Sequence, residues 1–294
     1  MIKGFIFQIK SRVERPHLIL YFIILRIKKF FKIGFETDTN KHSPKIDIMI
    51  PTVSKDFTLI KDVIDSFLKI NHEINKIFVV APPHEEIVQY CSKNNLQFVD
   101  EKTVLGYGKD AIKYFVNNTN RNGWIFQQLL KLSGENIVEM DNYFILDSDT
   151  IIANNFSLIE NDKFIFYQNE EWHSAYFKAF YKIFGYKTIN KLSFTSHMMI
   201  FNKNMLRLMK KEMEAKKGKS WDEVYLSTID PNEASCISDY DTYANWVLCN
   251  FPNKVIQRPL YNKALSRDKL QEVKNNMGRY SKILKTISFH SYIK

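Results

Sequence analysis

Residues 143–150 read Tyr-Phe-Ile-Leu-Asp-Ser-Asp-Thr, an apolar run that leads straight into two carboxylates. The first four residues are typical of a buried strand, so Asp147 and Asp149 are expected at its carboxyl end. Two carboxylates two residues apart converge when the strand ends in a turn. Their oxygens then suit a hard divalent cation, Mn²⁺ or Mg²⁺. The simpler alternative is a solvated turn or a helix cap.

Apolar strand-like runs alternate with helical periodicity on both sides of this stretch. Strands are predicted at 46–52, 76–83, 97–100, 143–146, 163–167 and 197–201, and helices at 57–70, 84–94, 123–132, 174–184, 204–217 and 240–249. This alternation predicts an α/β fold with a mostly parallel sheet flanked by helices. Ligands bind such sheets beyond the carboxyl ends of the strands. The segments expected there are 51–56, 81–84 and 100–103.

Several protein classes are excluded by composition and motifs. The chain has 294 residues, of which 45% are hydrophobic and 25% charged, which is ordinary for a globular protein. Neither GxGxxG nor GxxxxGKS occurs, which argues against dinucleotide enzymes and P-loop NTPases. The three cysteines share no metal-ligand spacing, so a reduced, cytoplasmic protein is expected.

The basic charge is concentrated at the N-terminus. Of the formal charge of +10, +7 falls within residues 1–45, where the apolar stretch 17–25 is followed by further basic residues. A spanning helix needs roughly 20 apolar residues, so the N-terminus is predicted to form a short basic, apolar helix, and residues 1–35 are predicted to lie on an anionic membrane surface. A helix packed on the protein's own core and an incomplete membrane span are the alternatives. A nucleic-acid binder would spread its basic charge over a folded face.

Five short blocks of sequence follow one another in a distinctive order. They are residues 50–52, 123–132, 146–150, 196–199 and 238–245. In this order they resemble the GT-A fold nucleotide-sugar glycosyltransferases. More narrowly, they resemble a bacterial polysaccharide-biosynthesis family long catalogued as a domain of unknown function. The resemblance covers about residues 46–262, and it implies a donor that is a nucleoside-diphosphate sugar, with UDP favoured.

The resemblance also implies roles for individual residues. The residues implied to bind the nucleotide sugar are Thr52, Lys55, Gln127, Gln128, Lys131, Asp147 and Ser148. Metal ligands would be Asp147, Asp149 and the late histidine His290. The alternatives are a surface helix with a polar face at 123–132 and a histidine with no ligand role at 290.

Asp239 and Asp241 follow Ser238 at a predicted helix start, where acidic residues commonly serve as caps. The resemblance implies instead that one of them is the general base of an inverting transferase, with Asp239 preferred. The acceptor would be contacted by Trp172, His173 and His197. For His197 a satisfied core histidine is the alternative.

The predicted organisation is an arm at 1–40 and a transferase domain at 45–294, with a nucleotide half at 45–150 and an acceptor half at 151–294. The predicted function is a metal-dependent glycosyltransferase that acts on a glycan or lipid-linked acceptor in surface polysaccharide synthesis. It would work on the inner face of the cell membrane. Alternatives are a membrane-attached binding module with a degenerate transferase fold, a sugar nucleotidyltransferase and, on charge alone, a nucleic-acid binder.

Overall fold

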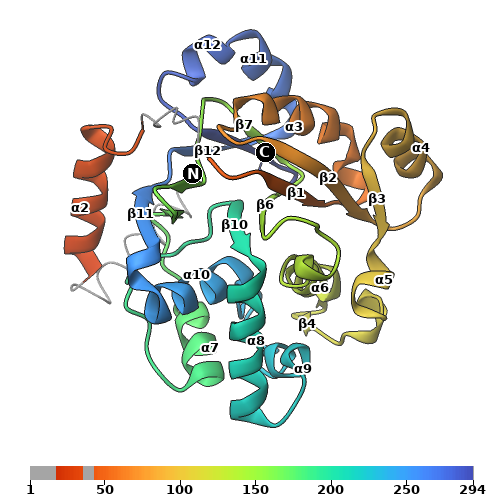
Figure 1. The fold of residues 1–294 in the computed structure, drawn as a ribbon, viewed down its shortest axis with the longest axis vertical. Coiled ribbons are helices and arrows are strands. Elements are labelled where there is room, and N and C mark those ends of the chain that lie inside the picture. Colours follow the sequence, from red (N-terminus) through yellow and green to blue (C-terminus); the bar gives the residue numbers. More distant parts are fainter. Residues whose placement is uncertain (1–17, 36–42, 294) are drawn as a thin grey trace.

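A five-stranded sheet forms the centre of the molecule. The computed structural model describes residues 18–35 and 43–293. The strands lie in the order β10 (Met198–Asn202), β6 (Asn142–Leu146), β1 (Ile46–Pro51), β2 (Ile74–Ala81) and β3 (Gln97–Asp100), as Figure 1 shows. All neighbours are parallel except β10, which runs antiparallel to β6. The predicted α/β fold with a mostly parallel sheet is confirmed.

Helices cover both faces of this sheet (Figure 1). They include α3 (Ile60–Ser66), α4 (Glu85–Lys93), α6 (Asn122–Lys131), α8 (Lys203–Lys217) and α10 (Asp239–Asn250). Local chemistry sets their starts: the Asn202 side chain caps α8 and the Ser238 side chain caps α10 by accepting backbone N–H groups. Buried apolar residues on α6, such as Ile125 and Leu129, fasten it to the core.

The helix predicted over 57–70 is broken into three pieces. They are the 3-10 turn η2 (Ser54–Leu59), α3 and the 3-10 turn η3 (Phe67–Lys69). Ser66 explains the second break, because its hydroxyl donates to the Val63 carbonyl at 2.6 Å and accepts the Ile152 N–H at 3.1 Å. The helix end is therefore tied to a neighbouring strand.

Two smaller sheets accompany the central one, and of their strands only β9 (Lys163–Gln168) was predicted, at 163–167. One is β12 (Asn262–Ser266), β13 (Thr286–His290) and β7 (Thr150–Ile152), and the other is β11 (Val255–Pro259), β9 and β8 (Ile159–Glu160). The strand β7 begins directly after Asp149 and pairs antiparallel with β13. This pairing carries the C-terminal segment to the end of β6.

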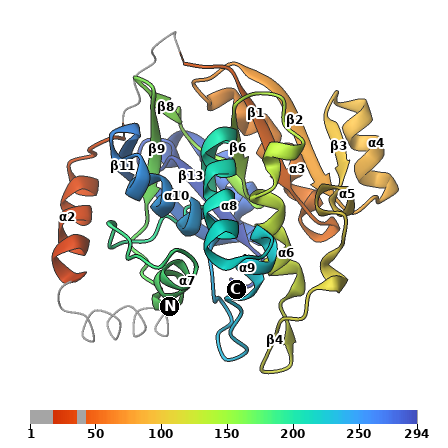
Figure 2. The ribbon, with the colours of Figure 1, turned by 60° about the horizontal axis from the view of Figure 1, so that its bottom comes forward.

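The remaining elements are short apart from α7. They are α5 (Glu101–Leu105), the hairpin β4 (Phe115–Val116) and β5 (Thr119–Asn120), α7 (Ser174–Phe184), α9 (Trp221–Leu226), α11 (Leu270–Asn275), α12 (Met277–Tyr280) and 3-10 turns at Lys109–Ala111, Gly134–Asn136, Pro252–Lys254 and Arg267–Lys269. Figure 2 shows the hairpin projecting beside α6.

The predicted N-terminal helix is present as α2 (Ile19–Phe30), which stands at the side of the body (Figures 1 and 2). It packs through Leu18, Phe22 and Leu25 on Leu192 and Trp172, a cluster separate from the main core. None of the helices in the described part of the chain is long and apolar enough to cross a membrane. Residues 1–17 and 36–40 of the predicted arm lie outside the described residues.

Candidate active site

A cleft of about 680 Å³ opens at the carboxyl ends of the parallel strands. The loop after β1, the start of α5, the start of α6 and the residues after β6 form its walls, because parallel strands present their carboxyl ends at one edge of a sheet. Six of the predicted site residues line it together. They are Thr52, Lys55, Gln127, Asp147, Ser148 and Asp149.

Asp147 is held by three side chains. Its Oδ1 accepts from the Lys131 ammonium at 2.6 Å and from the Tyr240 hydroxyl at 2.8 Å, and its Oδ2 lies 3.3 Å from Nδ1 of His197. Burial opposes ionisation, but Lys131 and His197 together hold the pKa of Asp147 well below its usual value. The hydrogen bond that His197 makes to the Asp147 carboxylate in turn raises the pKa of His197 against the effect of burial. Asp147 is therefore ionised at neutral pH, and His197 is one of the residues that contact its carboxylate.

Asp149 meets the C-terminal segment. Its Oδ2 lies 3.0 Å from Nδ1 of His290, and its carbonyl accepts the Phe289 N–H at 2.7 Å. The rings of His290 and His197 are 4.9 Å apart, and Tyr292 stacks on His290 at 4.8 Å. Two residues 141 positions apart are therefore in contact at the cleft.

The chemistry of this group suits a divalent cation. Carboxylate oxygens and an imidazole nitrogen from Asp147, Asp149 and His290 are donors that Mn²⁺ accepts, and Mg²⁺ accepts the carboxylates. Within the described ranges, however, no three His, Cys, Asp or Glu side chains are arranged as a finished metal site. Lys131, Tyr240 and His197 occupy the oxygens of Asp147 instead.

Lys131 is a buried bridge between two carboxylates. Its ammonium lies 2.6 Å from Asp147 and 3.4 Å from Oδ2 of Asp239. The longer contact lacks hydrogen-bond geometry, so among the described residues this Oδ2 is buried without a hydrogen-bond partner. Burial raises the pKa of Asp239 to about 6, although Lys131 opposes the shift. An acid with such a pKa takes up and releases protons near neutral pH.

Gln128 and Asp241 hold backbone in place and do not line the cleft. The Gln128 side-chain carbonyl accepts the Asp239 N–H at 3.0 Å and the Tyr225 hydroxyl at 2.6 Å. Asp241 accepts from the Ser193 hydroxyl, the Phe194 N–H and the Thr195 hydroxyl at 2.6, 2.9 and 2.9 Å. These contacts favour a structural role for Asp241.

Two of the predicted acceptor residues lie apart from the cleft. Trp172 packs against α2 and stacks on Phe177 at 5.7 Å. Nε2 of His173 lies 2.7 Å from the Ser235 carbonyl. The structure brings His197 alone of the three to the carboxylates, and contact with an acceptor stays a prediction for all three.

Sequence reasoning missed Arg267, which ties two walls of the cleft together. Its guanidinium pairs with Asp56 and donates to the Lys55 carbonyl at 2.7 Å and the Phe289 carbonyl at 3.4 Å. No motif marks this arginine, because its role depends on strands that meet only in the folded chain. Tyr240, which donates to Asp147, was also missed. It lies in the block 238–245 directly after Asp239, and this neighbouring position is the one feature of the sequence that could have indicated it.

The fold and the site define an α/β protein with a cleft at the carboxyl edge of a mostly parallel sheet, and the cleft holds the neighbouring carboxylates Asp147 and Asp149. The chain belongs to a family described as of unknown function, DUF6492, which matches residues 43–268. This match confirms the predicted resemblance to a family of unknown function over nearly the same residues. No curated protein matches the sequence.

Among solved structures, the chain is similar to several glycosyltransferases. Mouse xyloside xylosyltransferase 1 has 10% identity and a TM-score of 0.43, over 85% of this chain and 99% of that chain. The galactosyltransferase LgtC, solved with donor and acceptor sugar analogs, has 10% identity and a TM-score of 0.44, over 84% and 88%. The bifunctional glycosyltransferase WbbM has 11% identity and a TM-score of 0.42, over 88% and 48%.

Proposed function

We propose that the protein is a metal-dependent glycosyltransferase. It would move a sugar from a nucleoside-diphosphate sugar, UDP favoured, to a glycan or lipid-linked acceptor in bacterial surface polysaccharide synthesis. The observation that carries the proposal is the pair Asp147 and Asp149 in the cleft, beside the buried Lys131 and Asp239. The alternatives for Asp147 and Asp149, a solvated turn or a helix cap, do not require a buried lysine that pairs with both Asp147 and Asp239.

Asp149, Asp147 and His290 would hold Mn²⁺ or Mg²⁺, which when bound neutralises charge on the departing diphosphate. Thr52 supports a nucleotide in the same cleft, because its hydroxyl is buried at the cleft wall and has no hydrogen-bond partner in the described chain. Lys55 adds a cation to this wall, and Gln127 and Ser148 add polar groups. Lys131 positions Asp147 for this role.

Asp239 would accept the proton of the acceptor hydroxyl. Its Oδ2 is paired in charge with Lys131 but has no hydrogen-bond partner among the described residues. Together with a pKa of about 6 this supports a general base, since such a group is ionised at neutral pH and able to take a proton. The cap at Ser238 and the contact with Gln128 fix its backbone. Asp241, the second candidate, would steady the loop at 193–195.

Nucleotide binding tests the donor site directly. With Mn²⁺ present, one nucleoside diphosphate at 100 times its Kd is expected to stabilise the protein by about 2.7 kcal/mol, a rise in Tm of roughly 5–10 °C. Differential scanning fluorimetry with and without EDTA measures this. A folded protein that responds to no nucleotide would contradict the proposal. Metal-dependent binding with no sugar transfer would favour the degenerate binding module.

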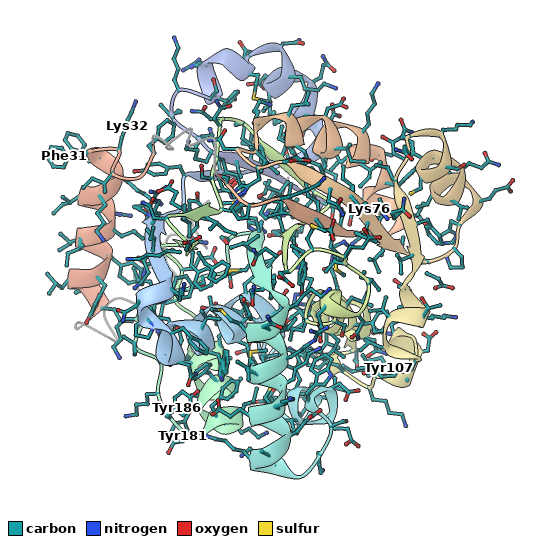
Figure 3. All side chains as sticks on the ribbon, in the orientation of Figure 1. Phe31, Lys32, Lys76, Tyr107, Tyr181 and Tyr186 are labelled. Carbon is teal, nitrogen blue, oxygen red and sulfur yellow. The ribbon has the colours of Figure 1, made fainter. Side chains whose placement is uncertain are left out.

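The surface of α2 supports a peripheral position on the inner face of the membrane. Its outward side carries large apolar residues, and Figure 3 shows Phe31 at its end pointing away from the body. The exposed apolar residues are Ile19, Leu20, Tyr21, Ile23, Ile24, Ile27, Phe30, Phe31 and Ile33. Basic residues flank them, and Glu170 binds Arg26 at 3.3 Å and Lys29 at 3.1 Å. An apolar stripe edged by cations suits anionic lipid.

Vesicle flotation tests this surface. The chain is expected to float with vesicles that contain anionic lipid, and the Ile23→Glu/Ile27→Glu variant is expected to stay in solution, because two carboxylates would enter the apolar stripe. Ile189→Glu is the matched control, since Ile189 is a similarly exposed isoleucine outside α2. Equal flotation of both variants would refute a membrane role for α2.

A further inference from the structure

One buried acid in the cleft has no part in the proposed chemistry. Glu101 follows β3 as the first residue of α5, is only 7% exposed and lines the cleft. Within residues 18–35 and 43–293, no hydrogen bond or ion pair engages its carboxylate. Burial raises its pKa, and the nearby charge of Lys109, also in the cleft wall, lowers it. A buried acid is costly unless a partner arrives.

The position of Glu101 along the sheet edge fits one end of an extended ligand. The strand order β3-β2-β1-β6 places three strand spacings between Glu101 and Asp147, roughly 14 Å at about 4.8 Å each. The register keeps the strand ends level, with Asp100 opposite Ala81 and Val80 opposite Pro51. A nucleoside diphosphate that has its phosphates at Asp147 and Asp149 and extends along this edge would have its base near Glu101.

The cleft wall offers surfaces that suit a planar base. Trp124 lines it, and the Arg121 guanidinium lies 4.5 Å from the Trp124 ring centre. Pro82 adds an apolar face from the end of β2. Aromatic rings and guanidinium planes stack on bases without distinguishing them, so discrimination falls to a polar group such as Glu101.

We infer that Glu101 is a specificity-determining residue that accepts a hydrogen bond from the ring N–H of the donor's base. This inference rests on the proposed function. An ionised carboxylate only accepts hydrogen bonds. Uracil and guanine present a ring N–H at the centre of their pairing edge, whereas cytosine and adenine present a lone pair there. Two acceptors facing each other leave a buried group unpaired, which costs enough to reject the wrong base.

Isothermal titration with UDP, GDP, CDP and ADP, each with Mn²⁺, tests the inference. The native protein is expected to bind UDP or GDP about 10–100 times more tightly than CDP or ADP. Which of the two binds more tightly identifies the base. Glu101→Gln is expected to weaken the preferred nucleotide and to improve CDP, because an amide both donates and accepts. The matched control is Glu86→Gln, an exposed acid on α4, which is expected to bind as the native protein does.

The outcomes separate this inference from the proposed function. Binding of all four nucleotides with similar affinity would overturn the inference alone. An equal loss for all four in Glu101→Gln would also overturn it, because that result indicates a contact with the ribose. No binding of any nucleotide by the folded protein would overturn both.

Discussion

Asp149→Asn is expected to lower the rate of sugar transfer, or of hydrolysis of the donor, by roughly 10²–10³-fold. This is the usual effect of losing one contact that stabilises the charge developing in the transition state. The amide removes the charge that pairs with a divalent cation. The fold is expected to stay intact, because Asp149 lines the cleft and asparagine has nearly the same shape. Initial rates of nucleoside-diphosphate release from a panel of nucleotide sugars at saturating Mn²⁺ measure the effect. The stabilisation by nucleotide and metal is expected to disappear with the activity.

Asp162→Asn serves as the control for this variant. Asp162 is exposed in the turn between β8 and β9, with a φ of 58° that asparagine tolerates well. The same charge change there is expected to leave the rate unaltered. An Asp149→Asn protein that keeps its rate and its metal-dependent binding of nucleotide would refute the metal-dependent mechanism.

Asp239→Asn is expected to lower the rate of sugar transfer by roughly 10²–10⁴-fold, because the general base is lost. The same substitution is expected to make the folded protein more stable at alkaline pH. The pKa of Asp239 is about 6 in the folded chain, above the ordinary value of 3.8. The folded state therefore binds the proton more tightly than the unfolded state does. That stabilisation is complete below about pH 4 and is lost as pH rises to 6, and the ionised carboxylate then costs up to about 3 kcal/mol. Asparagine avoids this cost.

Urea unfolding at pH 5 and pH 8 measures the change in stability. The free energy of unfolding of Asp239→Asn is expected to exceed that of the native protein by more at pH 8 than at pH 5. Asp241→Asn is the control from the same helix turn, and it is expected to be less stable than the native protein, because the Asp241 carboxylate accepts four hydrogen bonds. An Asp239 variant that keeps its rate would exclude the general base role.

Local sequence determines a large part of the fold. The strands β1 and β6 are mostly apolar, and the proline that ends β1 and the aspartate that follows β6 mark where they stop. The helix α6 has the apolar spacing of a packed helix, and Ser238 marks the start of α10. Because parallel strands end at one edge, these patterns suffice to bring Thr52 and Asp147 to a common cleft.

The partners within the site are decided only by tertiary structure. His290 reaches Asp149 because the three-residue strand β7 pairs with β13, and a strand that short carries no readable period of two. Lys131 and Glu101 have ordinary surroundings in the sequence. The first becomes a buried bridge between Asp147 and Asp239, and the second becomes an unpaired acid in the cleft wall. Burial and ion pairing depend on residues far along the chain, so their effects on charge arise only when the chain folds.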